Sequence, residues 1–92
     1  MPRYLIQLTH EDEHDACVRA LHAVKQYGSH LVTHMEWGCK DGVHSGWSMG
    51  ECEDRSEALM MVPPEMRQDA LVVKLDTFTP DEIEAWIAEL ES

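Results

Sequence analysis

The chain has 92 residues, which suffice for a single folded domain over residues 1–92 but not for two. Its 18 acidic and 7 basic side chains give a formal charge of -11, which repels nucleic-acid phosphates and anionic membrane surfaces, so we expect neither as a partner. A core of this size is marginal on its own, and we therefore expect self-association as a homodimer. Three cysteines without a CxxC pair favour a reducing compartment over a disulfide framework, which predicts a cytoplasmic protein.

A strand and a helix are predicted at the start of the chain. Tyr4, Ile6 and Leu8 recur with a period of two, which is typical of a strand. Four acidic residues within positions 11–15 favour the positive end of a helix dipole, and Gly28 marks the end of that helix. The helix stripe that should face the core is Cys17, Ala20, Leu21 and Val24.

A hairpin is predicted next, with strands at residues 29–37 and 43–52. Asp41 and Gly42 between them are typical of a two-residue turn, because both central positions of such a turn need positive φ. The turn sets the register of the hairpin, in which the opposed pairs are Glu36 with Trp47, Trp37 with Gly46, and Cys39 with His44.

The remaining segments predict a helix, a strand and a terminal helix. Asp54 with Glu57 resembles a capping box, residues 70–75 are strand-like, and Thr79-Pro80 begins the last helix. That helix carries a stripe that should pack on the body, formed by Ile83, Trp86, Ile87 and Leu90. The order βαββαβ plus a C-terminal helix predicts an α+β, ferredoxin-like sandwich, in which two helices cover one face of a four-stranded antiparallel sheet. Its second face needs either the last helix or another subunit as cover.

Several short strings carry a resemblance to known proteins. They are Trp37-Gly38-Cys39, Gly42, His44, Gly46-Trp47, Val62-Pro63-Pro64 and Arg67. On these residues the chain resembles small uncharacterised bacterial proteins of ferredoxin-like type. In its order of elements alone it is similar to the dimeric α+β barrel superfamily, which includes cofactor-free monooxygenases. That resemblance implies a dimeric fold and assigns no residue a role.

Cys39 and His44 are the sharpest candidates for a metal site, because the predicted register puts their β-carbons roughly 5 Å apart. If a dimer axis passes near the hairpin tips, two subunits supply a Cys2His2 set that suits zinc, with nickel as an alternative. Cys17, on the buried helix stripe, is expected to take no part, and metal affinity should fall below about pH 6. The alternative is a hairpin end with an apolar cysteine and a solvated histidine.

A second candidate site is a small-molecule pocket on the other hairpin face. His34 and Glu36 are candidate catalytic residues there, since an imidazole and a carboxylate can act as a general base. Trp47 and Gln7 would line this pocket, and Arg67 is a candidate for binding an anionic ligand. The alternative is a half-polar sheet face that a partner subunit covers.

Three hypotheses for function follow from these candidates. The first is a non-enzymatic homodimeric module that binds a small ligand or simply assembles. The second is a cofactor-independent enzyme of dimeric α+β barrel type that uses His34 and Glu36. The third is a metal-binding protein built on Cys39 and His44.

Overall fold

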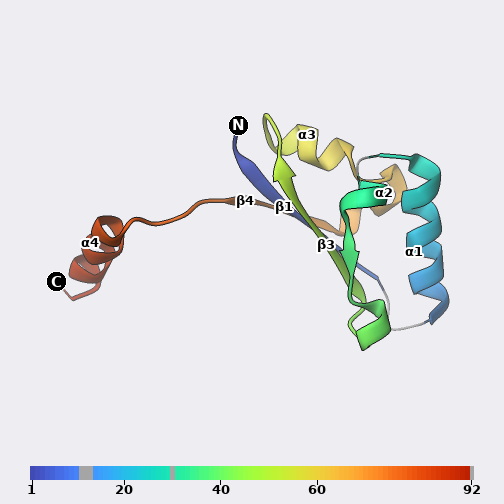
Figure 1. The fold of residues 1–92 in the computed structure, drawn as a ribbon, viewed down its shortest axis with the longest axis horizontal. Coiled ribbons are helices and arrows are strands. Elements are labelled where there is room, and N and C mark those ends of the chain that lie inside the picture. The colour runs from blue at the N-terminus through green and yellow to red at the C-terminus, as the bar shows by residue number, and fades with distance from the viewer. Residues whose placement is uncertain (11–13, 30, 92) are drawn as a thin grey trace.

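The computed structural model describes residues 1–10, 14–29 and 31–91, which form an α+β fold with a four-stranded sheet (Figure 1). The strands are β1 (Arg3–Thr9), β2 (Glu36–Trp37), β3 (Ser45–Glu51) and β4 (Ala70–Leu75). The α-helices are α1 (His14–Tyr27), α2 (Leu31–His34), α3 (Arg55–Met60) and α4 (Pro80–Glu91), and two 3-10 helices are η1 (Cys39–Asp41) and η2 (Pro64–Asp69). No helix within the described ranges has both the length and the apolar character that crossing a membrane requires.

The sheet is antiparallel throughout, with the order β2-β3-β1-β4. β1 pairs with both neighbours, and its Ile6 lies opposite Ser48 of β3 and opposite Val72 of β4. Side chains of a strand alternate between the two faces, so Tyr4, Ile6 and Leu8 all point to one face. All three are buried there, which makes this the core face.

The core lies between that face and the helices. Val24 of α1, Leu31 of α2 and Ala58 of α3 are buried against the sheet, together with Val62 and Cys52. The predicted stripe of α1 is confirmed for Cys17, Ala20 and Val24, which are buried. It is wrong for Leu21, which is 43% exposed, while Ala16 is buried instead. The buried side of α1 is thus rotated toward Ala16.

The predicted hairpin is right in register and wrong in length. Glu36 lies opposite Trp47 and Trp37 opposite Gly46, as the turn position implied. The strand expected over residues 29–37 is instead the helical turn α2 followed by only two strand residues. Leu31 and Met35 are both buried and the Met35 amide donates to the Leu31 carbonyl at 3.1 Å, because a spacing of four places both side chains on one side of a helical turn.

The hairpin turn also differs from the prediction. Residues 38–42 form the 3-10 turn η1, and Gly42 closes it with φ 80° while its amide donates to the Cys39 carbonyl. Within this turn only Gly42 has positive φ. Asp41, which was expected to share it, belongs to η1 instead. The consequence is that Cys39 lies in η1, outside the β2–β3 ladder, and does not oppose His44 as a strand neighbour.

Both predicted caps are confirmed. Asp54 Oδ1 accepts from the Glu57 amide at 2.8 Å, which begins α3. At α4 the Thr79 hydroxyl accepts from the Glu82 amide, and Glu82 accepts in return from the Thr79 amide, both at 3.2 Å. These reciprocal bonds satisfy amides that a helix start otherwise leaves without partners.

The prediction that α4 packs on the body is wrong. Every residue from 76 to 91 is exposed, and Trp86 is 63% exposed, contacting the ring of Phe78 edge-on at 4.8 Å between centroids. Figure 1 shows α4 standing clear of the sheet at the end of an extended segment. Local signals determine that residues 80–91 are helical, but they do not determine what the helix contacts.

Replacement of Leu8 tests the position of the core. Leu8 is 1% exposed at the centre of the core face, so Leu8→Ala should lower the free energy of unfolding by about 2–5 kcal/mol through lost burial and the cavity left behind. Leu21→Ala removes the same atoms from the outer side of α1 and should cost well under half as much. Equal losses in urea unfolding of the two variants would contradict the assignment of the core face.

Candidate metal centre

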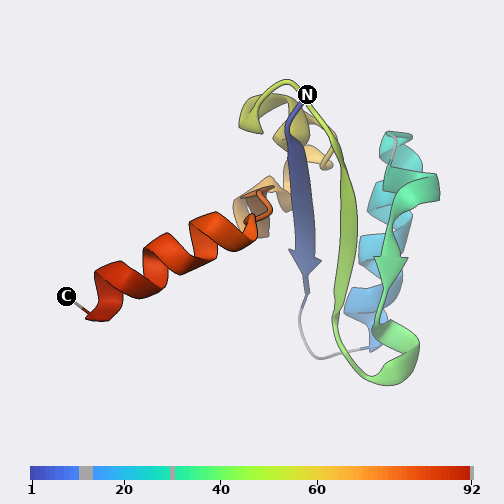
Figure 2. The same ribbon diagram turned by 60° about the vertical axis from the view of Figure 1, so that its left-hand side comes forward.

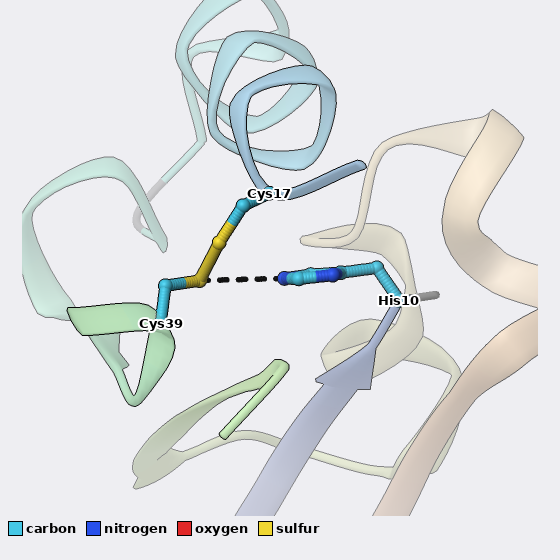
Figure 3. The surroundings of a disulfide bond; sticks show 3 residues. All are labelled: His10, Cys17 and Cys39. Atoms are coloured by element: carbon cyan, nitrogen blue, oxygen red, sulfur yellow. Dashed lines mark hydrogen bonds between the residues drawn. A yellow bond between two sulfur atoms is a disulfide. The ribbon is translucent and has the colours of Figure 1, made fainter. Parts of the chain in front are cut away.

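Four side chains of metal-ligating type converge at one end of the sheet. His10 follows β1, Cys17 belongs to α1, Cys39 to η1, and His44 precedes β3. Cys17 and Cys39 form a disulfide, and Nε2 of His10 lies 3.3 Å from Cys39 Sγ (Figure 3). The ligand atoms of His10, Cys17 and His44 all lie within 4.8 Å of one another. We call His10, Cys17, Cys39 and His44 the Cys2His2 cluster.

The β1–β3 ladder brings the two histidines together. Thr9 opposes Ser45, and the next pair outward is His10 and His44, joined by a 3.1 Å hydrogen bond from the His10 amide to the His44 carbonyl. By alternation both imidazoles share the face of Leu8 and Gly46, which is the side that α1 covers. Their rings meet edge-on with 5.2 Å between centroids.

The cysteines reach the same point from two other elements. Cys17 is buried on the side of α1 that faces the sheet, and Cys39 of η1 is bonded to it. Trp37 lies at one side of the Cys2His2 cluster, with its ring centroid 6.5 Å from that of His10. A β-carbon at Gly46 would approach the Trp37 ring to 2.5 Å, so the absence of a side chain at Gly46 lets the indole lie there. Within the cluster Cys17 is buried, and His10, Cys39 and His44 are half-buried.

Two cysteine predictions are corrected by this geometry. The expectation that the cysteines form no disulfide is wrong for Cys17 and Cys39. Cys17 was also expected to stay apart from Cys39 and His44, yet its sulfur is bonded to Cys39 and lies among the histidines. Since one chain holds two cysteines and two histidines together, a second subunit is not needed to complete a Cys2His2 set.

The spacing suits a tetrahedral metal after modest adjustment. Zinc bonds of about 2.0 Å to nitrogen and about 2.3 Å to sulfur place ligand atoms roughly 3.3–3.8 Å apart. The 3.3 Å separation of His10 Nε2 from Cys39 Sγ falls in that range. The 4.8 Å limit for the ligand atoms of His10, Cys17 and His44 is about 1 Å wider. The two sulfurs must part to act as separate thiolates, so the disulfide and the metal-bound form exclude each other.

A surface cleft of about 650 Å³ opens beside the cluster. His10 lines it together with residues of α1 and η2, and its polar wall includes Arg19, Glu65 and Asp69. The cleft gives a small ion or a reductant a path to the imidazole of His10.

The residues of the predicted small-molecule pocket are only partly brought together. Trp47 Nε1 donates to Gln7 Oε1 at 3.0 Å, and Glu36 opposes Trp47 in the ladder. His34 lies on α2, so the strand alternation that was expected to place it on one face with Glu36 does not hold. Arg67 lies in η2, where it donates to the Val62 carbonyl and to the Tyr27 hydroxyl, both at 2.9 Å.

Arg67 therefore joins the end of α1 to the loop after α3. Its guanidinium also lies 5.8 Å from the centroid of the Tyr27 ring, a cation-π contact. This position is on the helical side of the sheet, whereas Gln7 and Trp47 point to the opposite face.

Comparisons of this chain with protein-family models, curated proteins and solved structures give no match. The site is therefore interpreted from its own geometry and chemistry.

Cys52 is the third cysteine and stands apart from the cluster. It is 2% exposed and lies in the main core. Burial raises the pKa of its thiol above the ordinary value of 9.0, and repulsion by the carboxylates of Glu57 and Asp54 raises it further. A buried thiol that resists ionisation is a poor nucleophile and a poor metal ligand.

Alkylation tests this distinction. In the oxidised, folded protein at neutral pH, iodoacetamide should leave Cys52 unmodified, because the thiol is buried and protonated. After unfolding in guanidinium chloride without reductant, one carbamidomethyl group per chain should appear by mass spectrometry. Cys52→Ser should acquire none in either state, and rapid labelling of folded wild-type protein would refute the assignment.

Proposed function

We propose that the protein is a ferredoxin-like module that binds one zinc ion through the thiolates of Cys17 and Cys39 and the imidazoles of His10 and His44. The observation that carries the proposal is the convergence of these four side chains from four separate segments. Metal binding is favoured over the enzyme hypothesis because His34 and Glu36 do not share a strand face. The sheet order β2-β3-β1-β4 supports the ferredoxin-like arrangement, in which β1 and β3 are the central strands.

Zinc suits this ligand set better than nickel. Two thiolates and two imidazoles are typical of tetrahedral structural zinc sites, whereas nickel(II) favours square-planar or tetragonal ligand fields. His10 would bind through Nε2, the atom that faces Cys39. The metal would join the end of β1, α1, η1 and the start of β3, so its binding free energy would add to the stability of the fold. We also propose that the protein works in a reducing compartment, because zinc binding requires Cys17 and Cys39 as free thiols.

Zinc titration of the reduced full-length chain is the direct test. Calorimetry under a metal-free phosphine reductant should give one zinc per chain, and excess zinc should raise the melting temperature by preferential binding to the folded state. Cys17→Ser, Cys39→Ser and His10→Gln should each weaken binding by more than the 10- to 100-fold that loss of an outer-shell partner typically costs.

Matched replacements away from the cluster control for general effects on folding. Cys52→Ser removes the remaining thiol, and His22→Gln removes an exposed imidazole from α1, so both should bind zinc as the wild type does. Wild-type protein that is folded, fully reduced and unable to bind zinc would contradict the proposal. So would Cys17→Ser with unchanged affinity.

Oxidation should release the metal. When hydrogen peroxide accepts two electrons and two protons it becomes two waters, and the thiolates of Cys17 and Cys39 lose those electrons to form one S–S bond. Zinc-loaded protein treated with peroxide should therefore release one zinc, measured with a chromogenic chelator, for every two thiols lost. Loss of both thiols with zinc retained would show that the metal is held elsewhere.

A further inference from the structure

The terminal helix carries an apolar stripe that no described part of the chain buries, although Phe78 contacts the ring of Trp86. Ile83, Trp86, Ile87 and Leu90 follow one another at helical spacing, and all four are exposed. The acidic residues of α4 lie around the rest of the helix. A helix of 12 residues is marginal in water without tertiary packing, so α4 as it stands lacks the contacts that would stabilise it.

The sheet has a second apolar surface that none of the described helices covers. The face opposite the core, here called the open face, alternates with Tyr4, Ile6 and Leu8 along the strands. Its apolar members are Leu5, Trp47, Met49, Leu71, Val73 and Leu75. Met49 is 59% and Leu71 49% exposed. In Figure 2 no helix lies in front of β1 and β3 on the side facing the viewer.

The exposed area exceeds what a compact monomer of this mass shows. The chain of 10.5 kDa exposes 6750 Å², whereas about 5,400 Å² is expected for a folded monomer of that mass. The radius of gyration is 16.3 Å, against about 12 Å for a compact chain of this length. The surplus of about 1,300 Å² is more than the roughly 800 Å² that each partner buries in a stable interface of standard size.

We propose that two copies of the chain form a two-fold homodimer in which the stripe of α4 from each copy packs on the open face of the other. A second copy is the occupant we infer because one chain carries both apolar surfaces and covers neither with the other. A two-fold axis makes the exchange reciprocal, so each copy donates one helix and receives one. The linker at residues 76–79, which extends about 13 Å, carries α4 away from its own sheet toward a neighbour.

This interface is separate from the Cys2His2 cluster, which lies on the core side of the sheet. Dimerisation is therefore expected with or without zinc, and with the Cys17–Cys39 bond intact or reduced. Failure of zinc binding would leave this inference standing, and failure of dimerisation would leave the metal proposal standing.

Sedimentation velocity of the full chain at micromolar concentrations tests the interface. Wild-type protein should sediment as a dimer. Trp86→Glu in α4 and Leu71→Glu on the open face should each raise the dissociation constant at least about thirtyfold, because each places a charge in a desolvated contact. Val18→Glu, which puts the same charge on an exposed position of α1, should leave the dimer intact. Circular dichroism should show that all three variants remain folded.

Mixing the two interface variants tests whether α4 is exchanged between the two copies. Trp86→Glu protein retains a normal open face and Leu71→Glu protein a normal α4, so their heterodimer keeps one of the two exchanged contacts. The equimolar mixture should associate more strongly than either variant alone. A monomeric wild type, a dimer unaffected by both substitutions, or a mixture without added association would each overturn the inference.

Discussion

The antiparallel pairing of β1 with β3 is the constraint on which the rest of the structure depends. Its register determines which side chains of the two central strands share a face. Tyr4, Ile6 and Leu8 thereby point toward the helices, and Leu5 and Gln7 point away. The same alternation carried one residue beyond the ladder puts His10 and His44 side by side on the core side. The core face, the open face and the pairing of the two histidines in the Cys2His2 cluster thus follow from one register.

The Cys17–Cys39 bond and the proposed metal site are two uses of the same position. Both need α1 and η1 to be held near the end of the β1–β3 ladder. The disulfide joins those elements covalently, and the metal would join them by coordination. Because the sulfurs cannot be a disulfide and two thiolate ligands at once, the thiol state decides which form exists. Of the four cluster residues, His10 lines the cleft, so small reagents can approach the cluster at that imidazole.

The parts of the fold that the sequence predicted are those with local causes. The Thr79–Glu82 cap depends on residues three apart, and the Glu36–Trp47 register follows from the position of Gly42. The helical turn α2 was missed because a β-branched, alternating segment is typical of a strand, and only burial of Leu31 with Met35 favours the helix. The exposure of α4 was missed because its stripe is typical of a docked helix whatever surface it docks on.

Two residues of the proposed site, Cys39 and His44, were candidates from the sequence. They were paired there through a β2–β3 ladder that in the structure ends at Trp37 and Gly46. His10 was not among the predicted site residues, although its even spacing from Leu8, which puts both side chains on one face, was a usable signal. Cys17 was read as core, which its burial confirms, but burial against a sheet and proximity to Cys39 are compatible. That proximity depends on how α1 crosses the sheet, which no local pattern encodes.

X-ray absorption at the zinc edge can identify the ligands of zinc in the reduced, zinc-loaded full chain. We expect a four-coordinate shell with two sulfurs at about 2.3 Å and two imidazole nitrogens at about 2.0–2.1 Å. A shell made only of oxygen and nitrogen, or one that keeps both sulfurs in Cys17→Ser protein, would contradict the proposed ligand set.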